Sequence, residues 1–194
     1  MKRWLSLCLA ILCTYITSLA QVNKINGVSF VGPPREIDSA EISLPKRIIN
    51  SNYLCLMPYG SIPEGSTELK YNSEWQWWGE KTKGAATMIK LSKEQGYKIM
   101  LKPHIWKKHG AFTGHHTYRT KNEWEAFEKS YSTYILDFAA LAEKVELFCI
   151  GTEWGEFVQE RPEYWLTLIK EVKKVYTGKL TYAANWDEYK KVPF

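Results

Sequence analysis

The stretch Val145–Trp154, Val-Glu-Leu-Phe-Cys-Ile-Gly-Thr-Glu-Trp, decides the fold of this chain. Its apolar run from Leu147 to Ile150 ends at a glycine, which is typical of a short strand buried on both faces. The acid that follows, Glu153, would lie at the C-terminal tip of this strand, where α/β barrels keep their chemistry. Two interpretations of Glu153 are open on this stretch alone: a catalytic acid, or a solvated loop or helix-capping acid.

Strand-length apolar runs lie on both sides of this stretch and alternate with helical patterns. The other expected strands are Ile25–Phe30, Tyr53–Met57, Tyr97–Lys102 and Lys179–Ala183. The expected helices are Glu36–Asn50, short or interrupted by Pro45, then Gly84–Gln95, then Asn122–Glu143 with a capping box of Asn122 and Glu125, and a last one from Pro162. Strand and helix therefore alternate along the chain, which predicts a parallel α/β sheet with right-handed crossovers.

The loops are unequal in length, and this asymmetry favours a (β/α)8 TIM barrel. Long loops follow strands at Tyr59–Gly79 and His104–Thr120, whereas the connections that precede strands are one or two residues long. The working face of such a barrel is the one formed by the loops after its strands. An open doubly wound sheet is the alternative, but no Gly-rich phosphate loop follows the first strand.

The number of strands predicts an incomplete barrel. A full barrel takes about 250 residues, and only five strands are expected here. We therefore expect residues 21–194 to hold about the first five strands of a barrel, as a fragment rather than an unusual open sheet.

The N-terminus has the pattern of a secretory signal peptide. A basic start at Met1-Lys2-Arg3 is followed by the apolar run Trp4–Ile16 and a small-x-small end at Ser18–Ala20. We expect cleavage after Ala20 and a secreted or periplasmic protein. The apolar run is too short to span a bilayer.

Charge and cysteine content narrow the function classes further. The formal net charge of +5 is spread over alternating Lys and Glu without a basic stripe, which argues against nucleic acid as a partner. Cys55 and Cys149 fall on the second and fourth expected strands, roughly 9–10 Å apart. A disulfide tolerates about 7 Å at most, so we expect two buried free thiols. No feature of the sequence indicates the oligomeric state.

Side chains suited to sugar binding follow the strands. Tyr59 follows the second strand, His104 and Trp106 the third, Glu153 and Trp154 the fourth, and Asn185 and Trp186 the fifth. The C-terminal ends of parallel strands meet on one face, so we expect these residues to gather there. Aromatic faces stack on the apolar face of a pyranose, and apolar surroundings raise a carboxyl pKa, as a proton donor requires. This chemistry needs no cofactor.

Several of these residues also have plainer interpretations. Trp106 and the loop tryptophans Trp75, Trp77 and Trp78 could pack loops onto the barrel instead of facing a groove. Asp187 and Glu188 are expected to be loop or helix-cap acids, although Asp187 could orient a neighbour. A metal-dependent hydrolase would use His104, His109, His115 and His116, but their spacing matches no standard zinc pattern.

Three stretches resemble glycoside hydrolase family 113. They are Lys98–His104, Glu146–Glu153 and Leu180–Tyr189, and the similarity extends from Asn26 to Phe194. The resemblance implies a (β/α)8 retaining β-mannanase, in a clan that carries its acid/base on the fourth strand and its nucleophile on the seventh. By position, Glu153 matches the acid/base, and His104 and Asn185-Trp186 match residues that line the sugar subsite. Trp106 and Trp154 fall on no motif position of the family.

The resemblance also implies that the nucleophile glutamate lies beyond Phe194. We therefore expect a glycosidase acting on β-1,4-mannan or manno-oligosaccharides at full length, and no hydrolysis by this chain alone. A non-catalytic carbohydrate-binding barrel remnant is the alternative. Endo or exo action, and the choice of mannan over glucan or xylan, leave no signal in the residues themselves.

Overall fold

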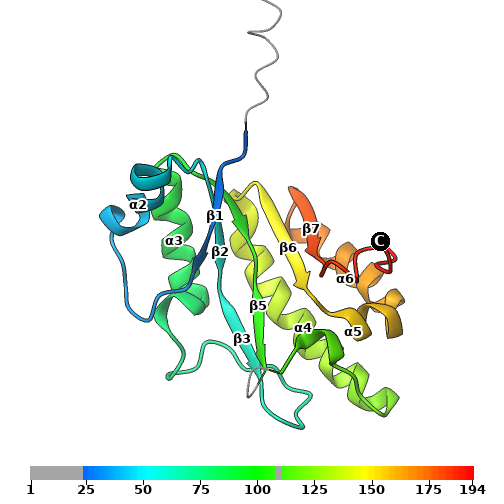
Figure 1. The fold of residues 1–194 in the computed structure, drawn as a ribbon. Coiled ribbons are helices and arrows are strands. Elements are labelled where there is room, and N and C mark those ends of the chain that lie inside the picture. The colour runs from blue at the N-terminus through cyan, green and yellow to red at the C-terminus, as the bar shows by residue number, and fades with distance from the viewer. Residues whose placement is uncertain (1–23, 108–110) are drawn as a thin grey trace, which may run out of the picture.

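A five-stranded parallel sheet forms the centre of the structure, a computed structural model that describes residues 24–107 and 111–194. The expected signal peptide, residues 1–20, lies outside the described residues. The strands lie side by side in the order β1, β2, β4, β6, β7 (Figure 1). They are Gly27–Val31, Tyr53–Met57, Lys98–Leu101, Leu147–Thr152 and Lys179–Ala183. Sequential order with parallel pairing throughout confirms the topology predicted from the sequence.

A second, two-stranded parallel sheet extends the first beyond two prolines. It pairs β3, Tyr59–Ile62, with β5, His104–Lys107, in the register Tyr59↔His104. Pro58 and Pro103 separate these strands from β2 and β4, because a proline has no N–H to donate to a ladder. Both segments were expected to be loops, and this expectation was wrong for their first four residues. The prolines end one ladder without ending the extended backbone.

The long helices cover one face of the central sheet, while the short helix α5 (Gly155–Glu160) follows the tip of β6. The long helices are α2 (Ser39–Ile49), α3 (Thr82–Glu94), α4 (Lys121–Leu141) and α6 (Pro162–Val175). Figure 1 shows α3, α4 and α6 behind the sheet. A doubly wound sheet carries helices on both faces, whereas a barrel wall carries them on the outer face only. The arrangement is therefore that of an incomplete (β/α)8 barrel.

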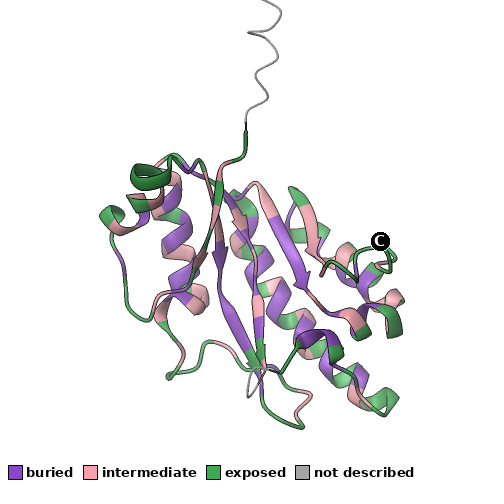
Figure 2. Ribbon diagram, viewed as in Figure 1, coloured by how far each residue is buried: buried purple, intermediate pink, exposed green. Residues whose placement is uncertain are grey.

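Burial along the strands follows this one-sided covering. Leu54 and Leu56 on β2 are fully buried, while Cys55, which alternates with them and so faces the other side of the sheet, is only partly buried. Figure 2 shows buried residues along β2 and β6 and none along the edge strand β1. Strand β6 is buried on both faces, as predicted, with every residue from Phe148 to Thr152 buried. Cys55 and Cys149 are free thiols on strands separated by β4, as expected, although only Cys149 is fully buried.

Three helix details differ from the sequence prediction. Pro45 lies inside α2, which runs from Ser39 to Ile49 without interruption. Asn50 ends this helix in a left-handed conformation with φ 52°, and its backbone N–H donates to the Pro45 carbonyl. The capping box at the start of α4 is formed by Thr120 and Glu123, not by Asn122 and Glu125. The short helix α5 was not predicted, because its six residues carry too little periodic pattern. None of the described helices combines the length and apolar character needed to cross a bilayer.

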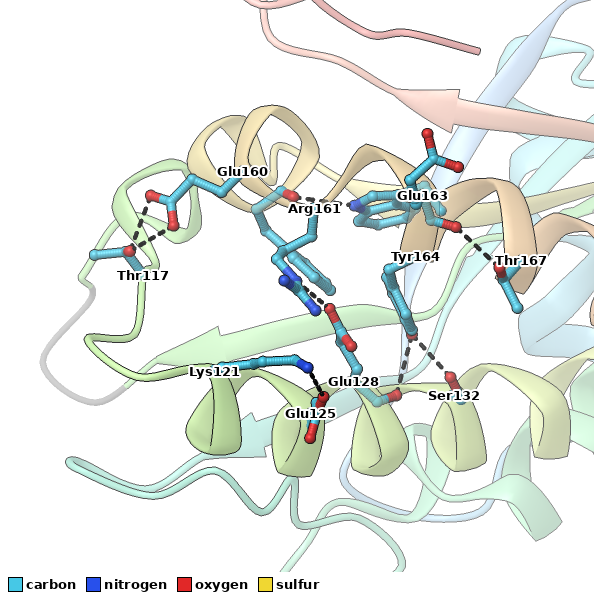
Figure 3. Close-up of polar contacts among 12 residues, drawn as sticks. Thr117, Lys121, Glu125, Glu128, Ser132, Glu160, Arg161, Glu163, Tyr164 and Thr167 are labelled. Carbon is cyan, nitrogen blue, oxygen red and sulfur yellow. Dashed lines mark hydrogen bonds and ion pairs between the residues drawn. The ribbon is translucent and has the colours of Figure 1, made fainter.

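An ion pair joins α4 to the start of α6. Arg161, the N-cap residue of α6, places Nε 2.5 Å from the Glu128 carboxylate on α4 (Figure 3). The Glu128 side chain is only 13% exposed, so its charge depends on this partner for compensation. In the same view Lys121 pairs with Glu125 on the open surface of α4 at 3.4 Å.

We predict that Arg161→Ala lowers the free energy of unfolding by about 1–3 kcal/mol, because it leaves the Glu128 carboxylate shielded and unpaired. Thermal or urea unfolding measures the change. Lys121→Ala is the matched control, since a solvent-exposed pair one helical turn apart contributes about 0.3–0.5 kcal/mol. Equal losses for the two variants would contradict the prediction.

Candidate active site

Glu153 lies where the polypeptide leaves the tip of β6. Its φ of 52° is in the left-handed region, which costs a non-glycine residue roughly 1–2 kcal/mol. Its backbone N–H donates to the Ala183 carbonyl on β7 at 2.9 Å, beyond the last regular pairing of the two strands. The side chain is half-buried, in contrast to the buried residues on either side. The turn therefore sends one carboxylate away from the core at the C-terminal end of the sheet.

Trp154 anchors this turn from inside the protein. Its side chain is 1% exposed, and its indole N–H donates to the Tyr131 hydroxyl at 3.0 Å. Its backbone N–H donates to the hydroxyl of Tyr182 on β7 at 2.6 Å. Trp154 thus offers no exposed ring face, contrary to its predicted role in sugar binding. The sequence could not reveal this, because the residues that cover Trp154 come from α4 and α5.

A buried carboxylate connects the tips of β6 and β7. Glu188 is 5% exposed, and one of its oxygens accepts the hydrogen bond of the Tyr182 hydroxyl. The other oxygen accepts from the backbone N–H of Asn185 at 3.0 Å. Burial, followed by the bond to Glu188, raises the pKa of the Tyr182 hydroxyl far above its ordinary value. Tyr182 therefore stays protonated, donates to Glu188 and accepts from Trp154.

Glu188 was expected to be a loop or helix-cap acid, and its backbone bond does have the form of a cap. A carboxylate that reaches back to an N–H three residues earlier is one half of a capping box. The spacing Asn185-x-x-Glu188 was therefore a usable signal. This spacing does not predict the second hydrogen bond of Glu188, because its donor, the Tyr182 hydroxyl, comes from β7 and not from the turn itself.

Asn185 and Trp186 lie at the β7 tip as the sequence predicted. Asn185 is half-buried, and its side-chain oxygen accepts the backbone N–H of Trp186 at 2.8 Å. This bond fixes the side-chain oxygen and leaves the amide N–H₂ group as a possible donor to a ligand. Trp186 is 82% exposed, so its ring has a free face.

An aromatic stack begins where β3 and β5 begin, just beyond the C-terminal tips of β2 and β4. The Tyr59 ring lies 5.1 Å from the His104 ring and 5.4 Å from the Trp106 ring, with interplanar angles of 27° and 28°. Tyr59 is almost covered, whereas Trp106 is 54% exposed. Trp106 therefore presents a ring face supported from behind, which is the arrangement of a sugar-stacking platform.

His104 is held between this stack and the protein interior. Its Nδ1 lies 2.7 Å from the backbone nitrogen of Ile105, which leaves Nε2 as the ring nitrogen for a ligand. Burial, aided by the nearby charge of Lys102, lowers the pKa of His104 below its ordinary value. The imidazole is therefore neutral at neutral pH and suits hydrogen bonding to an uncharged hydroxyl.

The remaining described histidines do not gather with His104. His115 packs edge-on against Phe112, and His116 lies among Tyr118, Phe127 and Trp154. His109 lies outside the described residues. Within residues 24–107 and 111–194, no three His, Cys, Asp or Glu side chains approach closely enough to hold a metal ion.

Comparison with known proteins identifies the family. The family model for Glycoside Hydrolase Family 113 matches residues 43–194, which include every predicted site residue. The chain belongs to this family. The resemblance noted in the sequence is thereby confirmed. No curated protein matches the chain.

Solved structures of family 113 share the fold. A β-1,4-mannanase complex aligns with a TM-score of 0.78 and 23% identity, over 89% of this chain and 59% of its own length. The β-mannanase AaManA from Alicyclobacillus acidocaldarius, in complex with ManMIm, aligns with a TM-score of 0.74 and 23% identity, over 90% of this chain and 58% of its own length. The chain thus spans somewhat more than half the length of these family 113 enzymes.

We predict that Tyr182→Phe lowers the free energy of unfolding by about 1–3 kcal/mol, because it removes an acceptor from the Trp154 N–H and a donor from Glu188. Urea unfolding measures the loss. Tyr189→Phe is the matched control, since Tyr189 is 58% exposed. The interpretation of Tyr182 as a link between strand tips fails if both variants unfold alike.

The stability of the chain should fall as the pH drops from 6.5 to 4. Burial, aided by Lys107, lowers the pKa of His116 to about 4 from an ordinary 6.5. Between pH 6.5 and pH 4, His116 is protonated in the unfolded chain but stays neutral in the folded chain. The free energy of unfolding is therefore unaffected by His116 above pH 6.5, and His116 lowers it by on the order of 3 kcal/mol as the pH falls to 4.

Denaturant unfolding across this pH range measures the effect. His116→Phe should flatten the decline, and His115→Gln, a change at an exposed neighbour, should preserve it. An unchanged slope in the His116 variant would refute the assignment.

Proposed function

We propose that this chain is part of a retaining glycoside hydrolase that cleaves β-1,4-mannan or manno-oligosaccharides. The observation that carries the proposal is the position of Glu153. It is a half-exposed carboxylate at the tip of β6, the fourth strand of the central sheet, within the family 113 match. The aligned solved structures are those of β-mannanases, which supports mannan as the substrate.

In the proposed reaction Glu153 acts first as acid and then as base. Its carboxyl proton passes to the glycosidic oxygen as the bond to the anomeric carbon breaks, while a second carboxylate attacks that carbon. Glu153 then removes a proton from the water that releases the sugar from the resulting ester. The hydrogen bonds that hold the Glu153–Trp154 peptide to β7 fix the position from which this proton is delivered.

The nucleophile of a retaining enzyme lies about 5–5.5 Å from the acid/base. Glu188 is a poor candidate, because it is buried and both of its oxygens already accept hydrogen bonds. We place the nucleophile on a strand outside the described residues, in line with the expectation that it follows Phe194. This chain alone should then bind the glycan without hydrolysing it.

We assign sugar binding to two groups of residues, one on each side of Glu153 along the C-terminal edge of the sheet. The supported ring of Trp106 and the neutral His104 form the first group, while Asn185 and the free ring of Trp186 form the second.

We also propose a secreted or periplasmic location on the basis of residues 1–20. N-terminal sequencing of the mature protein tests the cleavage after Ala20.

A non-catalytic carbohydrate-binding role is the second candidate. It is favoured by the same aromatic platforms, which bind a sugar whether or not hydrolysis follows. The two candidates differ in their dependence on Glu153. Hydrolysis requires the proton of this side chain, whereas binding requires only the platforms.

We expect the protein extended through the downstream coding sequence to release reducing sugar from β-1,4-mannan. Glu153→Gln should lower this rate by at least about 10²–10⁴-fold, since the amide keeps the shape but cannot transfer the proton. The chain ending at Phe194 should release none. Glu153-dependent hydrolysis by the shorter chain would instead point to Asp187 as the second acid, and full activity of Glu153→Gln would reject the proposed role.

A further inference from the structure

A pocket with two tryptophan walls lies beside the aromatic stack. It has a volume of about 230 Å³ and is lined in part by Tyr59, Trp75, Gln76, Glu80 and Trp106. Its walls come from β3 and β5 on one side and from residues 70–80, including Lys70, on the other. Trp106 lies two residues beyond His104 on β5, and alternate strand residues share a face. The pocket therefore adjoins the proposed cleavage site without including it.

The two tryptophans are unusually exposed for such large apolar side chains. Trp75 is 93% exposed and Trp106 is 54% exposed, whereas Trp78 from the same loop packs against the hydrophobic core. Trp106 is held in place by the Tyr59 ring at 5.4 Å. Exposed apolar rings that converge on one pocket indicate a ligand with an apolar face.

The same pocket also contains one shielded polar atom without a partner among the described residues, on Gln76, and one partly desolvated carboxyl, on Glu80. The amide N–H₂ of Gln76 donates to the carbonyl of Tyr59, while its side-chain oxygen is shielded from solvent and has no partner among the described residues. Glu80 is half-buried, and burial raises the pKa of its carboxyl above the ordinary range. A shielded acceptor beside a partly desolvated carboxyl calls for hydroxyl donors.

We propose that this pocket is a second sugar subsite, which binds the hexopyranose unit next to the one at the cleavage point. The rings of Trp75 and Trp106 contact the apolar face of the sugar, while Gln76 and Glu80 bind its hydroxyls. The sugar class rests on the proposed function. The combination of aromatic rings and a carboxyl disfavours a purely apolar ligand, because such a ligand would leave the Glu80 carboxyl unsolvated. Lys70, which also lines the pocket, adds a donor for a sugar hydroxyl.

The test measures binding to the chain itself and needs no catalysis. Intrinsic fluorescence and calorimetry follow mannotriose and mannohexaose binding to the wild type, Trp75→Ala, Glu80→Gln and Trp77→Ala. Trp77 is the matched control, because it lies in the same loop and is 51% exposed but does not line the pocket. Since Trp75 is almost fully exposed, its removal leaves the fold intact, which the unfolding midpoint verifies.

Trp75→Ala should weaken mannohexaose binding by roughly 3- to 10-fold, the range expected for one aromatic platform. Glu80→Gln should weaken it less, and Trp77→Ala should leave it unchanged. Trp75→Ala should weaken mannotriose binding by less than it weakens mannohexaose binding, because a shorter glycan can occupy the cleavage site without filling the pocket. Equal affinities of Trp75→Ala and Trp77→Ala for mannohexaose, or no oligosaccharide binding at all, would overturn the proposal.

The same panel separates this proposal from the proposed function. Oligosaccharides of glucose and xylose are included at the same lengths. If one of them shows the dependence on Trp75 in place of mannohexaose, the subsite stands and the choice of mannan fails. If mannohexaose binds as expected but the extended protein does not hydrolyse mannan, the subsite stands and the catalytic role of Glu153 fails.

Discussion

The candidate site depends on the hydrogen bonds that attach the backbone of Glu153 and Trp154 to β7. Two consecutive N–H groups at the tip of β6 donate to Ala183 and to the Tyr182 hydroxyl of the neighbouring strand. These bonds, together with the burial of the Trp154 ring, offset the strain of a left-handed glutamate. The acid therefore projects from a fixed backbone, so little freedom has to be lost when a glycan binds.

The same region separates two carboxylates by their surroundings. Glu188 is buried and accepts bonds on both oxygens, and it joins the β7 tip to the bond network of Trp154. Glu153 is half-exposed and reaches the open end of the sheet. A carboxylate with both oxygens occupied suits positioning, whereas one with room for a ligand suits proton transfer. Close packing supports the arrangement, because a Cβ on Gly151 would lie 2.7 Å from the Trp165 ring.

Much of the fold was predictable because it depends on periodic patterns within short segments. Strands β2 and β7 were predicted with their observed limits, and the Pro162 start of α6 was also correct. The continuation of extended backbone past Pro58 and Pro103 was missed, because a proline ends a ladder in sequence rules whether or not a new pairing follows. The choice between a barrel wall and a doubly wound sheet was settled by the single helical face, which only chain-wide packing fixes.

The sequence by itself determined the strand order, the placement of Glu153 at a strand tip and the membership of the family. Tertiary structure decided which aromatic and acidic side chains are available to a ligand. Trp154 and Trp106 look equivalent in the sequence, since each follows a strand. In the structure Trp154 is enclosed by residues of α4 and α5, whereas Trp106 stacks on the Tyr59 ring and remains exposed to solvent. The physical reason is that burial depends on neighbours supplied by segments distant in sequence, and no local pattern contains them.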